Sequence, residues 1–92
     1  MITSIKEKLI NLEIIYDNTY ADMYEKLIVD NIQTAEIKYE THKHHIVPRY
    51  YFKINSLPID NSSENLVNLH FSKHILAHYY LYKCARPDFI KS

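Results

Sequence analysis

Two stretches near the N-terminus space their apolar residues as amphipathic helices do. In residues 3–16 apolar side chains recur every three or four positions, at Ile5, Leu9, Leu12 and Tyr16. Side chains at this spacing lie on one face of a helix. The pattern therefore predicts a helix over residues 3–16 with one face packed against a core.

A second amphipathic helix is expected over residues 20–33. The cluster Asp17-Asn18-Thr19 interrupts the first pattern and supplies side chains that cap helix N-termini. Residues 35–41 follow as a short linker or strand. One apolar face is again expected to pack in the core, and its members are Tyr20, Met23, Tyr24, Leu27 and Ile28.

From residue 42 the pattern is typical of strands. Residues 43–47, KHHIV, have β-branched character and stop at Pro48, which predicts a short strand. Residues 66–69, LVNL, alternate apolar and polar positions and predict a second strand. Between the two strands, residues 49–65 are rich in turn-forming residues. A loop of that length in a small chain is usually functional.

A last helix is expected after the second strand. Ser72 is the expected N-cap. The helix should run to Cys84 or Ala85, because Pro87 stops it and the residue before a proline resists helix. The predicted order is two helices, then strand, long loop, strand and helix.

Composition narrows the class of protein. Ninety-two residues with 47% apolar content suit one folded domain, 1–92, divided into a helical part (1–40), a core (41–86) and a tail (87–92). The single cysteine, Cys84, excludes an internal disulfide and a Cys-rich zinc knuckle. We expect Cys84 to be a small buried hydrophobe.

The chain is expected to act inside the cell, away from membranes. It has no apolar run near 18 residues, and its first 15 residues carry two glutamates and no small-residue cleavage site, unlike a signal peptide. It also has no glycine, so we expect positions with positive φ to be taken by Asn or Asp.

Charge is divided unevenly although the formal net charge is 0. Residues 1–40 hold four lysines and eight carboxylates, a net −4, whereas residues 41–92 hold seven basic and three acidic residues, a net +4. The zero net charge argues against a generic polycation that coats nucleic acid. The basic part suits a partner that carries phosphate groups.

The basic part also contains all six histidines, at 42, 44, 45, 70, 74 and 78. His74 and His78 are four residues apart on the predicted helix, so both rings lie on one face. They can offer two imidazoles to one metal ion, as in the HExxH zinc motif, although its glutamate is absent here.

Three short motifs occur in order: KHHIVPR at 43–49, ENLVNL at 64–69 and KHILAH at 73–78. Together they resemble the HNH (His-Asn-His) endonuclease superfamily, and most of all its small phage and mobile-element members. Asn65 follows His45 by 20 positions and His74 follows Asn65 by nine, intervals compatible with the family. The resemblance covers residues 42–79. It implies an α+β fold in which a ββα-metal (His-Me) finger is preceded by two amphipathic helices.

The resemblance implies a role for each matched residue. His45 would be the general base that takes a proton from water, and His44, His74 and His78 would hold one divalent ion. Asn65 would either brace the loop that holds His45 or join the ion's shell. The implied reaction is hydrolysis of DNA phosphodiester bonds, leaving 5′-phosphate and 3′-hydroxyl ends.

The chemistry of the residues agrees with these roles. Neighbouring residues of a strand point to opposite faces, so His44 and His45 suit one ligand and one base. Three imidazole nitrogens favour Zn²⁺ or Ni²⁺, with Mg²⁺ or Mn²⁺ as alternative working ions. Arg49, Lys43 and Lys73 are candidate contacts to DNA phosphates. Sequence specificity would need a homodimer or a partner subunit.

Two histidines and an aromatic run have plainer explanations. His42 is expected to face solvent, with contact to phosphate or replacement of His44 as alternatives. His70 is expected to be structural or to face DNA. Tyr50, Tyr51 and Phe52 are expected to anchor the core or the loop, rather than to stack on bases.

A binding module of a different class is the rival hypothesis. Here the histidines would hold a structural zinc ion in a non-catalytic protein- or DNA-binding domain. A closed tetrahedral site needs a fourth protein ligand, which His42, His70 or Cys84 would have to supply.

Overall fold

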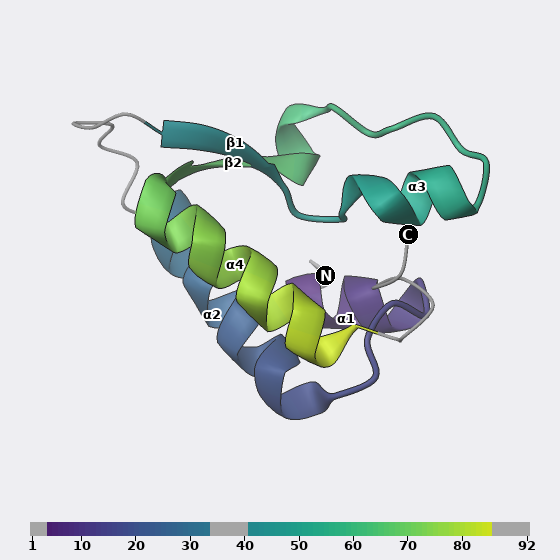
Figure 1. Cartoon of the computed structure of the whole chain (residues 1–92), viewed down its shortest axis with the longest axis horizontal. Coiled ribbons are helices and arrows are strands. Elements are labelled where there is room, and N and C mark those ends of the chain that lie inside the picture. Colours follow the sequence, from purple (N-terminus) through teal and green to yellow (C-terminus); the bar gives the residue numbers. More distant parts are fainter. Residues whose placement is uncertain (1–3, 34–40, 86–92) are drawn as a thin grey trace.

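The structure, a computed structural model, describes residues 4–33 and 41–85. Over those residues the fold is α+β, with helices and a two-stranded antiparallel sheet (Figure 1). The helix-strand-strand-helix order is compatible with the expected ββα unit. In chain order the elements are α1 (Ile5–Asn11), α2 (Asn18–Gln33), β1 (Thr41–His45), α3 (Arg49–Ile54), the 3-10 helix η1 (Ser63–Asn65), β2 (Leu66–His70) and α4 (Phe71–Cys84).

The sheet is a β1–β2 pair whose register places His44 opposite Val67 and His45 opposite Leu66. His44 and Val67 are both buried, because they lie on the face of the sheet that packs against the helices. The exposed pair Lys43 and Asn68 alternates with them. Helix α4 starts directly after β2 and lies beside α2, and both helices contact the sheet (Figure 1).

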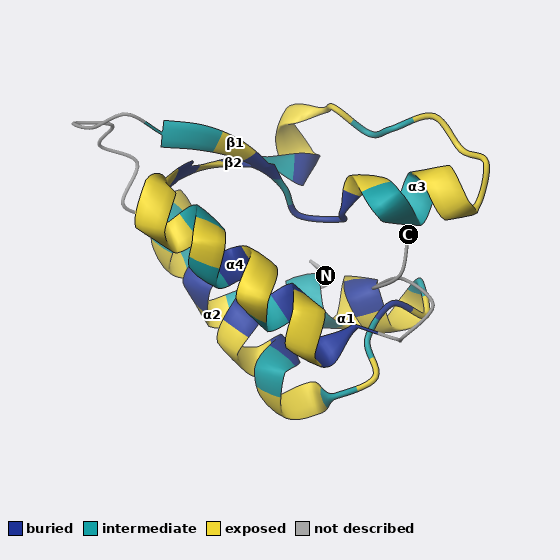
Figure 2. Cartoon of the chain, viewed as in Figure 1, coloured by how far each residue is buried: buried dark blue, intermediate teal, exposed yellow. Residues whose placement is uncertain are grey.

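One hydrophobic core joins the N-terminal helices to the sheet and α4. Buried positions concentrate where α2 and α4 face each other and the strands (Figure 2). Its buried apolar residues come from α1, α2, β2 and α4 and from the segments that follow α1, β1 and α4. The buried apolar members are Leu9, Ile14, Ala21, Tyr24, Leu27, Ile28, Ile46, Val47, Val67, Leu69, Ala77, Leu81, Cys84 and Ala85.

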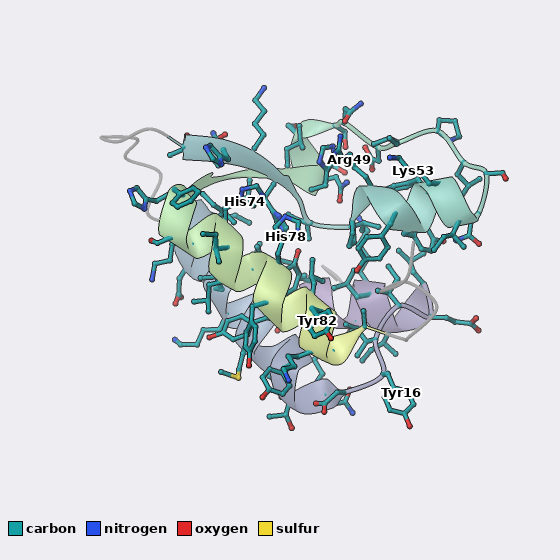
Figure 3. The ribbon with its side chains drawn as sticks, viewed as in Figure 1. Tyr16, Arg49, Lys53, His74, His78 and Tyr82 are labelled. Carbon is teal, nitrogen blue, oxygen red and sulfur yellow. The ribbon has the colours of Figure 1, made fainter. Side chains whose placement is uncertain are left out.

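Helix α1 ends at Asn11, well before the predicted end at residue 16. The chain beyond it forms a bridge between Ile15 and Ala85, and the Tyr16 amide donates to the Cys84 carbonyl at 2.6 Å. This tertiary pairing requires extended backbone, so it overrides the helical spacing of apolar residues. Tyr16 was predicted to be a core residue, but its side chain points outward and is 80% exposed (Figure 3).

The capping prediction for α2 is confirmed. The Asp17 carboxylate accepts hydrogen bonds from the amides of Thr19, at 2.8 Å, and Tyr20, at 3.3 Å. The helix starts at Asn18, two residues earlier than expected. Met23 is 42% exposed, so its assignment to the core was wrong.

The predicted long loop contains a helix that the sequence pattern did not reveal. Pro48 precedes α3 as its N-cap residue, where its fixed φ suits the start of a helix. As expected, the aromatic run Tyr50-Tyr51-Phe52 packs against the core, and it does so from this helix.

Helix α4 differs from the prediction at its start and agrees with it at its end. Its N-cap is His70, not Ser72, because the His70 Nδ1 accepts from the Ser72 amide at 3.3 Å. It ends at Cys84, as predicted, and Cys84 is fully buried. The expectations for residue 3, residues 35–40 and residues 86–92 fall outside the described residues. No helix in the described ranges has the length and apolar character needed to cross a membrane.

Helices α1 and α3 end in the same way. The Glu13 amide donates to Ile10 and the Ile14 amide to Leu9, a pair of hydrogen bonds that defines a Schellman motif. In α3 the Ser56 amide donates to Lys53 and the Leu57 amide to Phe52. The motif needs positive φ, usually from glycine. Glu13 (φ 62°) and Ser56 (φ 55°) adopt it here, so the expectation of Asn or Asp was wrong.

Replacing Ser56 with glycine should raise the free energy of unfolding by roughly 0.5–1 kcal/mol. Glycine adopts positive φ without the steric cost that a Cβ atom imposes. Urea unfolding of Ser56→Gly beside the parent measures the change. Ser62→Gly is the matched control, because Ser62 has φ −66° and gains nothing from glycine. Equal changes in the two variants would contradict the assignment of strain to Ser56.

Candidate metal centre

Three histidines from two elements meet beside the sheet. His44 comes from β1, and His74 and His78 come from α4. One ring nitrogen from each lies within 4.8 Å of the others, so the three could hold a metal ion. Figure 3 shows His74 and His78 on the side of α4 that faces the strands. The nitrogens His74 Nε2 and His78 Nε2 are 3.0 Å apart.

The strand places His44 inward and its neighbours outward or at the rim. The side chain of His44 is only 2% exposed. Its ring centroid is 5.4 Å from that of His74 and 5.2 Å from that of His78, and both pairs are close to perpendicular. The predicted i, i+4 arrangement therefore brings the two α4 rings to the inward-facing ring of β1.

His42 lies on the same face of β1 as His44, two residues away. Its Nδ1 is 3.2 Å from His74 Nδ1, and its ring packs against Phe71. The expectation that His42 faces solvent was wrong, since the residue is half-buried. If His74 binds an ion through Nε2, its Nδ1–H can donate to His42, an outer contact typical of metal-bound histidines.

His45 lies at the rim of the same site. Its Nε2 is 2.7 Å from Asn61 Oδ1. An amide oxygen only accepts hydrogen bonds, so Nε2 carries the hydrogen and Nδ1 keeps the lone pair. His45 can therefore accept a proton at Nδ1. Asn61 was not predicted to belong to the site, because in the sequence it is one of several polar residues in a turn-rich segment.

Asn65 braces the chain that follows His45. Its Oδ1 accepts from the Val47 amide at 2.8 Å, and its Nδ2 donates to the Asp60 carbonyl at 2.9 Å and the Val47 carbonyl at 3.3 Å. Its backbone carbonyl accepts from the Ile46 amide at 2.8 Å. Of the two predicted alternatives, this geometry favours bracing over a place in the ion's shell.

A cleft of about 400 Å³ opens over the histidines. Most of the described residues that line it carry basic or imidazole side chains, and none of those described carries a carboxylate. Lys53, which lies four residues after Arg49 on α3, was missed because the spacing matters only once that helix is known (Figure 3). Lys73 is exposed on α4 and does not line the cleft. The lining residues are Lys43, His44, His45, Pro48, Arg49, Tyr50, Lys53, His74 and His78.

The pKa of each clustered ring lies below its ordinary value, which favours the neutral form. Burial lowers the pKa of His44 from 6.5 to about 3, and the neighbouring His78 and His74 add to the shift. Burial and then the His78 ring lower the pKa of His74, and burial followed by Arg49 lowers that of His78. Neutral imidazole is the form that binds metal ions.

Three side chains form the cluster, and the three proposed as a fourth ligand have other contacts. His42 Nδ1 lies against His74 Nδ1, the Cys84 thiol donates to the Leu81 carbonyl at 3.7 Å, and His70 caps α4. Among residues 4–33 and 41–85, the histidine, cysteine and carboxylate groups that could share an ion are His44, His74 and His78. An ion there would keep a position for water or substrate, as catalytic sites do.

Fold and site together define a small α+β protein in which a β-hairpin and its following helix present three histidines able to bind a metal ion. No protein-family model, no curated protein and no solved structure matches the chain. The chemistry of the site therefore has to be inferred from the chain's own residues.

The metal-free protein should lose stability as pH falls below about 6.5. The folded state holds His44 neutral down to a pKa of about 3, whereas the unfolded chain takes up the proton near 6.5. In this window the unfolded state binds more protons, so the free energy of unfolding falls by at most about 1.4 kcal/mol per pH unit for this group. Urea unfolding in chelator from pH 7.5 to 4.5 measures the slope. His44→Gln should flatten it, and an unchanged slope would contradict the assignment.

Proposed function

We propose that the protein is a metal-dependent endonuclease that hydrolyses DNA phosphodiester bonds. One ion would be held by His44, His74 and His78, and His45 would act as general base. The observation that supports this best is that a proton acceptor, three metal ligands and several cations share one cleft. The resemblance of the motifs to HNH endonucleases points to the same chemistry.

His45 would remove a proton from the attacking water. Its Nδ1 lone pair is free, its Nε2–H is held by Asn61, and it lines the cleft beside the cluster. Imidazole accepts protons efficiently near neutral pH. The Asn65 clamp on Val47 would keep the chain after His45 in one place during the reaction.

A divalent ion in the cluster would neutralise the phosphate and stabilise the leaving alkoxide. Three neutral nitrogens favour Zn²⁺ or Ni²⁺ in affinity. The open coordination positions would also admit the water oxygens that Mg²⁺ or Mn²⁺ prefer. A set of three protein ligands supports this enzyme over a closed structural zinc site.

The cations of the cleft would hold the DNA backbone. Lys43, Arg49 and Lys53 line it without a carboxylate among them, so the cleft suits an anion. A guanidinium such as that of Arg49 can pair with two phosphate oxygens. Lys73, outside the lining, would contact DNA only further along the duplex.

Removing the base and removing a ligand should have different consequences. His45→Ala should reduce DNA cleavage by about 10²–10⁴-fold, because the base is lost, while metal affinity stays near that of the parent. His74→Ala should lose cleavage together with metal affinity. Calorimetric titration with Zn²⁺ or Ni²⁺, beside nicking of supercoiled DNA with each candidate ion and with chelator, measures both properties for each variant.

Contaminating nucleases are controlled by purifying all variants identically. If His45→Ala cleaves as well as the parent, the proposed mechanism is wrong. If the parent binds metal but cuts DNA with none of the ions, the non-catalytic zinc module is the better description. If His45→Ala weakens metal binding as much as His74→Ala does, the roles of ligand and base are reversed between His44 and His45.

Reversing the charge of a basic side chain in the cleft should lower the affinity for DNA and make that affinity less dependent on salt concentration. Arg49→Glu or Lys53→Glu should flatten the plot of log affinity against log salt by roughly one unit for each lost phosphate contact. Fluorescence anisotropy on a short duplex in chelator measures this without cleavage. Lys26→Glu is the control, because Lys26 lies on α2 and pairs only with Asp30 among the described ion pairs. Equal losses in control and cleft variants would contradict the assignment of the DNA-binding surface.

A further inference from the structure

We propose that Tyr24 on α2 sets which nitrogen of His44 faces the metal site, and that this nitrogen is Nδ1. Tyr24 is then a positioning residue that lies outside the hairpin and helix that carry the ligands. This inference rests on the proposed function only in taking His44 to be a metal ligand. It does not depend on whether the protein cleaves DNA.

The hydrogen bonds around Tyr24 determine the tautomer. Its hydroxyl oxygen is 2.7 Å from His44 Nε2 and 2.9 Å from the carbonyl oxygen of Ile46. A carbonyl only accepts, so the single hydroxyl hydrogen goes to Ile46. The short contact to His44 is then satisfied only if Nε2–H donates to the hydroxyl oxygen. A neutral ring with its hydrogen on Nε2 has its lone pair on Nδ1.

Both partners are enclosed by the protein, so water does not compete for their hydrogen bonds. Tyr24 is fully buried and His44 almost fully. If the Tyr24 hydroxyl and the His44 ring separated, each would need another hydrogen-bond partner inside the core.

The arrangement matches what metal-bound histidines need. Such a ring usually donates its second nitrogen to a carboxylate or carbonyl, which fixes both its tautomer and its orientation. Here a phenol takes that place, and its ring also packs edge-on against the imidazole at 5.9 Å between centroids. Rotation of His44 about its side-chain bonds would break the buried hydrogen bond, so the lone pair is held toward His74 and His78.

The position of Tyr24 gives the N-terminal helices a part in the site. Helix α2 packs against both β2 and α4, so Tyr24 reaches β1 from below the sheet. A hairpin and helix without α2 would keep all three ligands but lose the group that orients the most buried one. The acidic half of the chain would then strengthen metal binding, although none of its described residues belongs to the histidine cluster.

Tyr24→Phe tests the proposal because it keeps the aromatic ring and removes only the hydroxyl. We expect metal affinity to fall by about 10–100-fold, the usual effect of losing such an outer hydrogen bond. Tyr20→Phe is the matched control. Tyr20 lies one turn earlier on α2, where its ring packs against Tyr79 and Tyr80. The metal affinity of the Tyr20→Phe protein should equal that of the parent.

Nitrogen-15 spectra of the histidine rings provide a readout that a purely structural role would not move. In the metal-free parent, His44 should show the Nε2–H tautomer, and with Zn²⁺ bound its Nδ1 should show the shift of a ligating nitrogen. In Tyr24→Phe the single tautomer should give way to a mixture. The parent spectra need no variant, so they decide the question even if Tyr24→Phe fails to fold.

Two outcomes would overturn the proposal. One is a parent in which His44 carries its hydrogen on Nδ1 or binds Zn²⁺ through Nε2. The other is a Tyr24→Phe protein that melts at lower temperature but keeps the parent's tautomer and metal affinity, which would make Tyr24 a core residue only. A parent that binds metal through His44 Nδ1 yet cleaves no DNA would support this inference and refute the proposed nuclease.

Discussion

The register between β1 and β2 decides which histidine of the adjacent pair joins the cluster that could hold a metal ion. Opposite Val67, His44 faces the helices, and opposite Leu66, His45 lies at the rim of the cleft. A slip of one residue would exchange the two, since side chains alternate between the faces of a sheet. The Asn65 hydrogen bonds to Val47 and Ile46, just beyond the paired residues, hold the strands against such a slip.

Burial and charge act together on the cluster. Burial disfavours the charged forms of the three rings, and Arg49 opposes the protonation of His78 further. The site therefore has lone pairs at neutral pH but is surrounded by positive charge. A divalent ion would add to that charge, so a bound phosphate and a bound ion would each favour the other.

The absence of glycine from the sequence affects how two helices end. Glu13 and Ser56 both adopt positive φ to complete Schellman motifs. The turn at Glu13 directs the chain into the bridge with Ala85, which ties α1 and α2 to the end of α4. Tyr24, which contacts His44, lies on the helix that follows this turn.

Much of this arrangement follows from the sequence alone. The i, i+4 spacing of His74 and His78 and the Asp17 cap are local features, and local steric and hydrogen-bonding preferences are enough to predict them. The sequence also indicated the order of the helices and strands apart from α3 and η1, and the separation of the acidic and basic parts.

Only the tertiary structure decided the rest. The early end of α1, the contact of His42 with His74 and the alignment of Lys53 with Arg49 depend on where other elements lie. Tyr24 is the clearest case. Its spacing in the sequence predicted a core residue, and it is fully buried. Its hydroxyl acquires a partner only when α2 packs beneath β1, since a contact between residues 20 positions apart is set by packing and leaves no periodic trace in the sequence.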